Sequence, residues 1–137
     1  MTLSKDIFCA IATNDAPALI IAENDLAVAF LDREPTTEGH VLIIPKRHAD
    51  DILDISREEI TAVMSLAQHV AIILRNILGY TSVILHQVNG VEAQDIRHFH
   101  LHVYGGPNKI QHYYQQFGST DDLNKALLDT MKKMTQE

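Results

Sequence analysis

Polar and apolar residues alternate most sharply over residues 98–104, where His98, His100 and His102 take every second place. Successive side chains of a β-strand point to opposite faces, so this order predicts a strand over 96–104 with three imidazoles on one face. The other face is apolar and suits a core. With 8 histidines in 137 residues, chance gives this pattern an expectation of roughly 0.03 per chain. The stretch therefore predicts a place where something is bound or transformed.

Shorter apolar runs predict the other strands. Glu23-Asn24-Asp25 suits a turn between the first two, which makes them a hairpin. The third run is continuously apolar up to Pro45, which is typical of a central strand covered on both faces. The predicted strands cover residues 18–22, 27–31, 40–45 and 80–88.

Helical spacing of apolar residues predicts three helices. The longest follows Ser56-Arg-Glu-Glu59, which matches a capping box, and its apolar stripe lasts about six turns up to Leu78. Gly79 can close this helix in the left-handed conformation. A short helix is predicted over 4–12, and Ser119 or Thr120 can cap a final one.

These elements predict an α+β fold built on a five-stranded antiparallel sheet. One long helix would pack on the sheet, accompanied by a short N-terminal helix and a C-terminal helix. Hydrophobic residues make up 46% of the chain and charged residues 21%, as in ordinary globular proteins. Because the sequence holds no repeat, low-complexity tract or linker, we expect residues 1–137 to form a single domain.

Charge and targeting signals narrow the possible partners. A formal charge of -7 argues against binding to polymeric nucleic acid, although a single nucleotide needs only a local pocket. No apolar run approaches the length of a membrane span, and residues 1–6 lack the pattern of a secretion signal. Cys9 is the only cysteine, which excludes an intramolecular disulfide. We therefore expect a cytoplasmic protein that binds no membrane.

Strand geometry limits what the three histidines can do with a metal. Alternate residues lie roughly 6.5–7 Å apart, which places His98 and His102 about 13 Å apart. Zinc ligands lie only about 2.1 Å from their metal, so one ion could take two neighbouring imidazoles but hardly three. A hydrolytic zinc site, the basis of a metalloenzyme, would need a further ligand such as His48 or His86.

A row of imidazoles suits phosphorus chemistry better. One neutral imidazole can attack phosphorus, while a protonated neighbour stabilises the phosphoryl oxygens or protonates the leaving group. Histidine titrates near neutral pH, so both forms are available in one site. The pattern therefore predicts nucleotidyl transfer to histidine followed by hydrolysis.

Several motifs in the same order resemble those of the histidine triad (HIT) family. His98-Phe-His100-Leu-His102-Val-Tyr104 is similar to the signature of that family. The other similar segments are Asp6-Ile-Phe-Cys9-Ala-Ile11, Ala29-Phe30-Leu31-Asp32, Gly39-His40-Val-Leu-Ile-Ile-Pro45-Lys-Arg-His48, Asn89-Gly90 and Gln94-Asp95-Ile96-Arg97-His98.

The resemblance implies a homodimer that binds a purine nucleotide and hydrolyses substrates of the form AMP-X. The compact chain and its Gly105-Gly106 ending favour the phosphoramidase-like branch, which acts on adenosine phosphoramidates through a nucleotidyl-histidine intermediate. Two alternatives stay open: hydrolysis of dinucleoside polyphosphates, and a non-catalytic nucleotide-binding regulatory protein. No cofactor is implied.

The resemblance also implies roles for individual histidines. His100 would be the nucleophile, and His102 would contact the α-phosphate and the leaving group. His98 would orient the strand and its neighbour, and His48 would complete the cluster. The implied nucleotide-binding residues, besides His100 and His102, are Ile11, Phe30 and Leu31 around the base, Asp32 at the ribose, and Asn89, Gln94 and Asp95 in the loop before the triad.

Two departures from the family pattern carry expectations of their own. The loop before the triad is one residue shorter and has Asp95 where the family has a small hydroxyl residue. Either the Asp95 carboxylate turns away from the phosphate, or the activity is weak or altered. Asp6 and Cys9 stand where bacterial-type members carry a Cys-x-x-Cys zinc motif. Asp6, Cys9, His48 and His98 could still bind zinc, but we expect no metal and a buried, unligated Cys9.

Overall fold

The computed structural model describes residues 6–106 and 112–136, and their backbone forms an α+β fold. The elements in chain order are α1 (Ile7–Ala12), β1 (Ile20–Glu23), β2 (Ala27–Leu31), β3 (Val41–Pro45), α2 (Arg57–Asn76), β4 (Ser82–Gln87), β5 (Leu101–Gly106), the 3-10 turn η1 (Tyr113–Gln116) and α3 (Thr120–Thr135).

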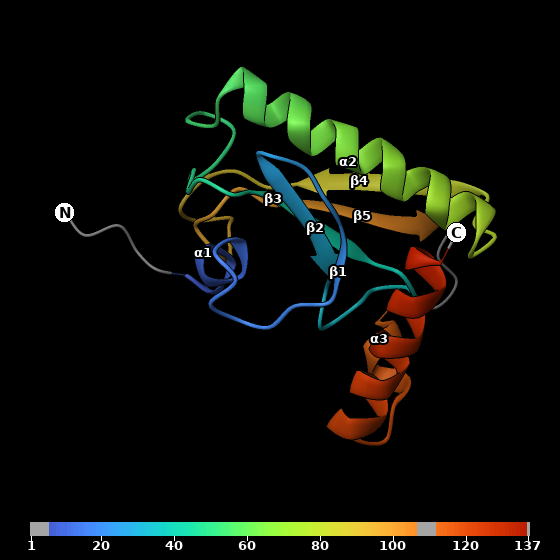
Figure 1. Ribbon diagram of the computed structural model, residues 1–137. Helices are drawn as coiled ribbons and strands as arrows, with labels where there is room; N and C mark the ends of the chain where they lie inside the picture. The colour runs from blue at the N-terminus through green and yellow to red at the C-terminus, as the bar shows by residue number, and fades with distance from the viewer. Residues whose placement is uncertain (1–5, 107–111, 137) are drawn as a thin grey trace.

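The strands form one sheet in the order β1-β2-β3-β5-β4, and every neighbouring pair is antiparallel. The long helix α2 runs across one face of the sheet, the short helix α1 lies on the opposite side, and α3 packs beside β1 (Figure 1). The predicted fold class is therefore confirmed, including the hairpin of β1 and β2.

The sheet is covered on both faces, and each face packs into its own apolar layer. β2 and β3 are buried at every position, so alternate residues serve different layers. The α2 layer is the larger and includes Val63, Val70, Leu74, Ile43, Phe99, Leu101 and Val103. The α1 layer consists of Phe8, Ile11, Val28, Phe30, Leu42 and Ile44.

Helix α2 begins where the capping box predicts and ends at Asn76, two residues before the predicted end at Leu78. The Ser56 hydroxyl accepts the Glu59 N–H, and the Glu59 carboxylate accepts the Ser56 N–H, which completes the capping box. After the last turn, Gly79 takes a φ of +78°. The Arg47 guanidinium donates to both Glu59 carboxylate oxygens, at 2.9 and 2.7 Å, and ties the start of α2 to the end of β3.

The prediction for the histidine strand is wrong about its bounds. β5 begins at Leu101, so His98 and His100 precede the strand. The reason is pairing: the ladders with β3 and β4 both begin at Leu101, and no strand among residues 6–106 and 112–136 pairs with the chain before it. The alternation nevertheless holds, because Phe99 and Leu101 enter the α2 layer while the histidines face the other way.

β5 also continues further than predicted, through Gly105 and Gly106. The Tyr80 ring lies against Gly105 so closely that a Cβ there would overlap the ring atoms. The Tyr80 hydroxyl in turn donates to the Glu38 carbonyl at 2.7 Å. This stacking links the end of β5 to the loop that leads into β3.

The terminal helices agree with their predicted signals. Asp6 caps α1 by accepting the Cys9 N–H at 2.7 Å, and positions 4 and 5 of the predicted helix lie outside the described residues. Ser119 caps α3 by accepting the Asp122 N–H. Between residue 112 and α3, the chain forms the 3-10 turn η1.

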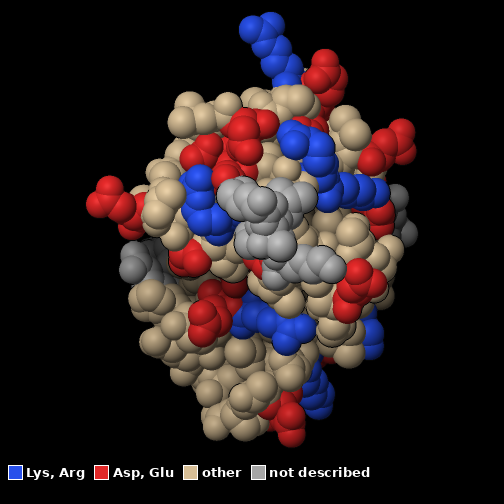
Figure 2. Space-filling view, turned by 90° about the vertical axis from the view of Figure 1, so that its left-hand side faces the viewer, with Lys and Arg blue, Asp and Glu red and all other residues tan. Residues whose placement is uncertain are grey.

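Surface charge is mixed. On the face toward the N-terminus, Lys and Arg side chains are interspersed with Asp and Glu (Figure 2). Among the described residues, no helix is long and apolar enough to cross a membrane. The cytoplasmic location and the single domain over 1–137 remain predictions.

Candidate active site

A cavity of about 650 Å³ opens between α1, the α1 face of the sheet and α3. Seven of the predicted site residues line it, from four separate parts of the chain. These are Ile11 on α1, Phe30, Leu31 and Asp32 at the end of β2, Asp95 in the loop before the triad, and His100 and His102.

His100 is buried, with 5% of its surface exposed, yet it reaches this cavity. Its Nδ1 lies 2.7 Å from the His98 carbonyl oxygen. Because a carbonyl can only accept, Nδ1 carries a proton, and in the neutral ring the lone pair is therefore on Nε2. The Phe8 ring packs edge-on against the imidazole at a centroid distance of 5.0 Å. The ring is therefore fixed in orientation, and in its neutral form Nε2 can offer its lone pair to an electrophile.

His102 receives its orientation from His40, a residue that the sequence analysis did not include in the site. The Thr36 N–H donates to His40 Nδ1 at 3.0 Å, so the His40 proton is on Nε2. That nitrogen lies 2.9 Å from His102 Nδ1 and 3.6 Å from Asp32 Oδ2. His102 Nδ1 therefore accepts, and Nε2–H is the donor that His102 can offer to a ligand.

Both histidines of this pair are neutral in the folded protein. Burial lowers the pKa of His40 to about 4, with a further contribution from His86. Burial, followed by the neighbouring His40 and His100, lowers the pKa of His102 to about 4, while Asp32 opposes this effect. A bound phosphate would oppose the shift at His102, because an anion favours the imidazolium form.

Asp32 stands where a loop leaves β2. Its Oδ1 accepts the Glu34 N–H at 2.9 Å, which holds the carboxylate beside the cavity. Its backbone N–H donates to the His40 carbonyl at 2.9 Å, so both sides of the loop are fixed to each other. A carboxylate in this position can accept two hydroxyl hydrogen bonds, as a ribose would require.

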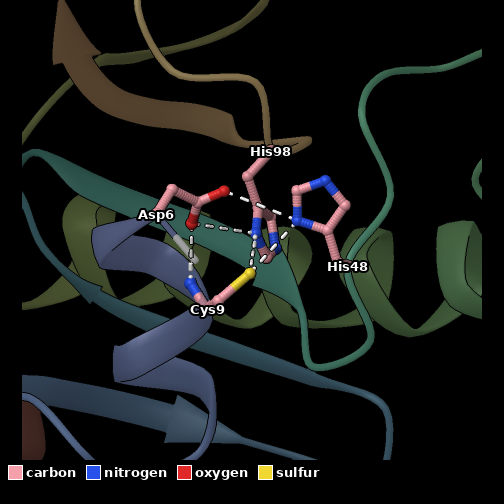
Figure 3. A group of neighbouring side chains, drawn as sticks. All are labelled: Asp6, Cys9, His48 and His98. Atoms are coloured by element: carbon pink, nitrogen blue, oxygen red, sulfur yellow. Dashed lines mark hydrogen bonds and ion pairs between the residues drawn. The ribbon is translucent and has the colours of Figure 1, made fainter. Parts of the chain in front are cut away.

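A second histidine group lies next to the cavity histidines and holds Asp6, Cys9, His48 and His98 (Figure 3). One donor atom from each residue lies within 4.8 Å of the others. Cys9 Sγ lies 3.1 Å from His48 Nδ1 and 3.4 Å from His98 Nδ1. Asp6 Oδ2 lies 3.4 Å from His48 Nδ1, and Asp6 Oδ1 lies 3.3 Å from His98 Nδ1.

The two imidazoles of this group are oriented from behind. His98 Nε2 lies 3.2 Å from the Pro45 carbonyl, and His48 Nε2 lies 2.7 Å from an Asp50 carboxylate oxygen. Those acceptors place both ring protons on Nε2, so both Nδ1 lone pairs point toward Cys9. Burial lowers the pKa of His98 and raises that of the Cys9 thiol.

Two predicted nucleotide-binding residues lie elsewhere, since neither Asn89 nor Gln94 is among the described residues that line the cavity. Asn89 accepts the Ile52 N–H at 2.8 Å. The buried Gln94 amide donates to the Asp50 carbonyl at 2.8 Å and accepts the Gly90 N–H at 3.1 Å. Both side chains hold the loop before the triad in shape.

The cavity also has walls that the sequence analysis did not predict. His40 could have been found, because Leu42 pairs with His102 in the β3–β5 ladder and His40 lies two residues earlier. Phe8 and Ile96 join the apolar wall, and Asn124, Leu127 and Leu128 on α3 close another side. No local sequence signal reports where α3 docks.

Known proteins resemble this chain in sequence and in structure. The HIT domain family model matches residues 13–109. The adenosine 5'-monophosphoramidase hnt1 of Schizosaccharomyces pombe is 36% identical over 104 residues, which are 75% of each chain. A Zn-bound histidine triad family protein from Mycobacterium smegmatis has a TM-score of 0.74, 29% identity and 95% coverage of both chains.

A HIT-like protein from Bartonella henselae, involved in cell-cycle regulation, superimposes with a TM-score of 0.83 over 98% of both chains at 24% identity, a likeness of fold. The motifs, the sheet topology and these matches agree with one another. This chain belongs to the histidine triad (HIT) family.

Proposed function

We propose that this protein hydrolyses adenosine phosphoramidates to AMP and an amine through a nucleotidyl-histidine intermediate. The observation that carries the proposal is the His100 ring, whose protonated Nδ1 faces the His98 carbonyl while Nε2 is left for the cavity. A relative at 36% identity is named an adenosine 5'-monophosphoramidase, which supports this substrate class.

In the first step, the lone pair of His100 Nε2 attacks the α-phosphorus and the P–N bond breaks. The departing nitrogen takes a proton from His102, which the bound phosphate has favoured in its imidazolium form. Before the nucleotide binds, the His40 Nε2–H orients the neutral His102 ring at 2.9 Å, and this hydrogen bond gives way when His102 Nδ1 takes up a proton. The products of the step are a free amine and AMP linked to His100.

In the second step, water attacks the phosphorus of the intermediate and the P–Nε2 bond breaks. His102, now neutral, takes the proton of that water, which restores its starting form. AMP leaves with the new P–O bond, and His100 regains its lone pair. The nucleoside would lie along Ile11, Phe30 and Leu31, with Asp32 accepting the ribose hydroxyls.

The test is release of AMP from adenosine 5'-phosphoramidate, followed by chromatography, together with the intact mass of the protein quenched in alkali. The wild type is expected to turn over and to carry a nucleotidyl adduct. His100→Gly should lose about 10³-fold or more in kcat and show no adduct. The matched control is His69→Gln, which alters an exposed histidine on α2. Unchanged turnover in His100→Gly would contradict the nucleophile assignment.

The same assay separates the two alternatives. Dinucleoside polyphosphates should be cleaved more slowly than the phosphoramidate if the proposal holds. A non-catalytic regulatory protein would bind AMP by calorimetry and leave every adenylate intact. Faster release of AMP from the polyphosphates would replace the proposal with that activity.

We infer that two copies pair through β4. It is an outer strand of the sheet, and Ile84 and Leu85 on it are 38% and 43% exposed. An open strand edge with apolar side chains is a template for pairing with a second chain. Sedimentation should give a dimer for the wild type and a monomer for Leu85→Lys. A monomeric wild type at micromolar concentration would contradict the inference.

We also propose that Asp6, Cys9, His48 and His98 hold a structural Zn²⁺, where the sequence alone favoured no metal. The donors are one sulfur, two nitrogens and one oxygen, a set that zinc accepts. Asp6 Oδ2 is buried and has no hydrogen-bond donor among the described residues. Both imidazoles point their lone pairs at this space, and a relative with 29% identity is Zn-bound.

Bound zinc would stabilise the docking of α1 and would take no part in hydrolysis. Metal analysis should find about one Zn²⁺ per chain, and a chelator should lower the Tm of the wild type. Cys9→Ala should bind less zinc and respond less to the chelator, whereas His69→Gln should behave as the wild type. A wild-type Tm that zinc and chelator leave unchanged would contradict the site.

A further inference from the structure

Asp95 is a charged side chain beside the nitrogen that we assign as the nucleophile. Its Oδ1 lies 3.6 Å from His100 Nε2, and the same oxygen accepts the Ile96 N–H at 3.0 Å. The side chain is 86% exposed, whereas the His100 side chain is 5% exposed. The carboxylate therefore lies at the solvent side of the cavity and is held there by the Ile96 N–H.

The rest of the cavity adds little positive charge. Among the described residues, its charged lining consists of Asp32, Glu34, Asp95 and Arg33. The Arg33 guanidinium reaches the Pro17 carbonyl at 3.4 Å, and no lysine of the described chain lines the cavity. A site for a polyphosphate tail gathers several cationic groups, and this lining has the opposite balance.

The position of Asp95 relates it to the leaving group. The nucleoside is expected in the enclosed part of the cavity, along Phe30 and Asp32. Attack then requires the phosphorus at roughly 3–3.5 Å from His100 Nε2. The group X must extend from that phosphorus toward solvent, which is the side on which Asp95 is exposed. X therefore extends past the Asp95 carboxylate on its way to solvent.

We propose that Asp95 selects adenylates whose leaving group carries a positive charge away from the scissile P–N bond. The proposal rests on the function proposed above and names the class of X. Asp95 makes and breaks no bond: it attracts a cationic X and repels an anionic one, and its repulsion of the α-phosphate is the same for every X. At roughly 6 Å in water-like surroundings, one such charge pair changes binding about threefold. A cationic and an anionic X should therefore differ by about tenfold in kcat/KM.

The experiment uses three adenosine phosphoramidates with the same six-carbon chain on nitrogen, ending in an ammonium, a hydroxyl or a carboxylate group. The leaving nitrogens are nearly alike, so differences in kcat/KM report the remote charge. Wild type, Asp95→Asn and Glu92→Gln are compared at low and high salt. Glu92→Gln is the matched control because it removes one exposed negative charge from the same loop, outside the cavity lining.

The wild type and Glu92→Gln should prefer the ammonium over the carboxylate substrate about tenfold, and salt should reduce the preference. In Asp95→Asn the ratio should fall to about one to threefold. Equal rates for all three substrates in the wild type would overturn the proposal while the hydrolase function stands. A preference that survives in Asp95→Asn would overturn the assignment to this residue. Failure of the wild type to cleave any of the three would instead overturn the proposed function.

Discussion

His98 and His100 are two residues apart, yet they belong to groups with different properties. His98 has no exposed surface and points its Nδ1 at Asp6 and Cys9, away from the cavity. His100 lines the cavity, and its Nε2 faces the solvent-exposed Asp95. The Phe8 ring touches both imidazoles and lies between the two groups.

The difference shows how one alternating pattern can serve two purposes. In both rings a hydrogen-bond acceptor fixes one nitrogen, but it fixes Nε2 in His98 and Nδ1 in His100. The other nitrogen consequently faces the side chains of Asp6 and Cys9 in His98, and the cavity beside Asp95 in His100. The first arrangement suits a structural tie, and the second suits a nucleophile.

The largest expected effect is a loss of kcat when His100 is replaced, and a loss of unfolding free energy when His98 is replaced. His100→Asn should lose about 10³-fold in kcat and less than about 1 kcal/mol in the free energy of unfolding. His98→Asn should lose about 3 kcal/mol in that free energy, because it disrupts a fully buried polar group, and should retain most of its turnover per folded molecule. Urea unfolding and AMP release measure the two quantities.

Both variants are measured with and without added zinc, so that an effect of metal binding is told apart from an effect of the substitution. If His98→Asn lost turnover as strongly as His100→Asn while remaining folded, the division into a structural and a catalytic group would fail.

The next effect concerns pH and the neutral imidazoles of the cavity. A folded-state pKa of about 4 for His40, against 6.5 for an ordinary histidine, means that the unfolded chain binds its proton first as pH falls. The stability is present above pH 6.5 and is lost between pH 6.5 and 4, by about 3 kcal/mol for this buried ring.

Unfolding in urea at pH 7, 6, 5 and 4 measures this loss. His40→Gln should show a shallower fall than the wild type, since it removes one of the groups whose protonation opposes folding. Parallel curves for the two proteins would mean that His40 is not a source of the pH dependence.

The smallest expected effect tests whether Asp50 belongs to the group of Asp6, Cys9, His48 and His98. Asp50 holds His48 at 2.7 Å, but its side chain is 46% exposed and solvent screens the interaction. Asp50→Asn should therefore cost about 0.5 kcal/mol and leave hydrolysis of AMP-X as it was. A thermal shift assay with and without zinc records the change, and a loss above about 2 kcal/mol would show that Asp50 lies within the group rather than at its edge.

Much of the fold could be predicted because its signals are local. The capping box at Ser56 and the apolar stripe after it lie in one stretch of sequence, and so does the alternation of the histidine segment. The start of β5 could not be predicted in this way. It depends on where β3 and β4 cease to offer partners, and those residues are far away in the chain.

The same distinction between local signals and contacts of distant residues applies to the site. His100 and His102 could be paired from the sequence because strand periodicity sends them to one side. The contact of the Gln94 amide with the Asp50 carbonyl could not be predicted, because only folding brings the two residues together. Leu128 lines the cavity but was not predicted to do so. It lies on α3, far from the histidines in sequence, and nothing in the sequence around the histidines indicates that α3 packs there.

The Tyr80 ring over Gly105 has a consequence for how this chain can vary. Any side chain at 105 must displace the ring, and the ring carries the hydroxyl that secures Glu38, two residues before His40. Substitutions at 105 would therefore be selected against even though Gly105 touches neither histidine group. In a saturation library, alanine at position 105 should be depleted unless Tyr80 is replaced by a smaller residue at the same time. Positions 80 and 105 are therefore expected to covary.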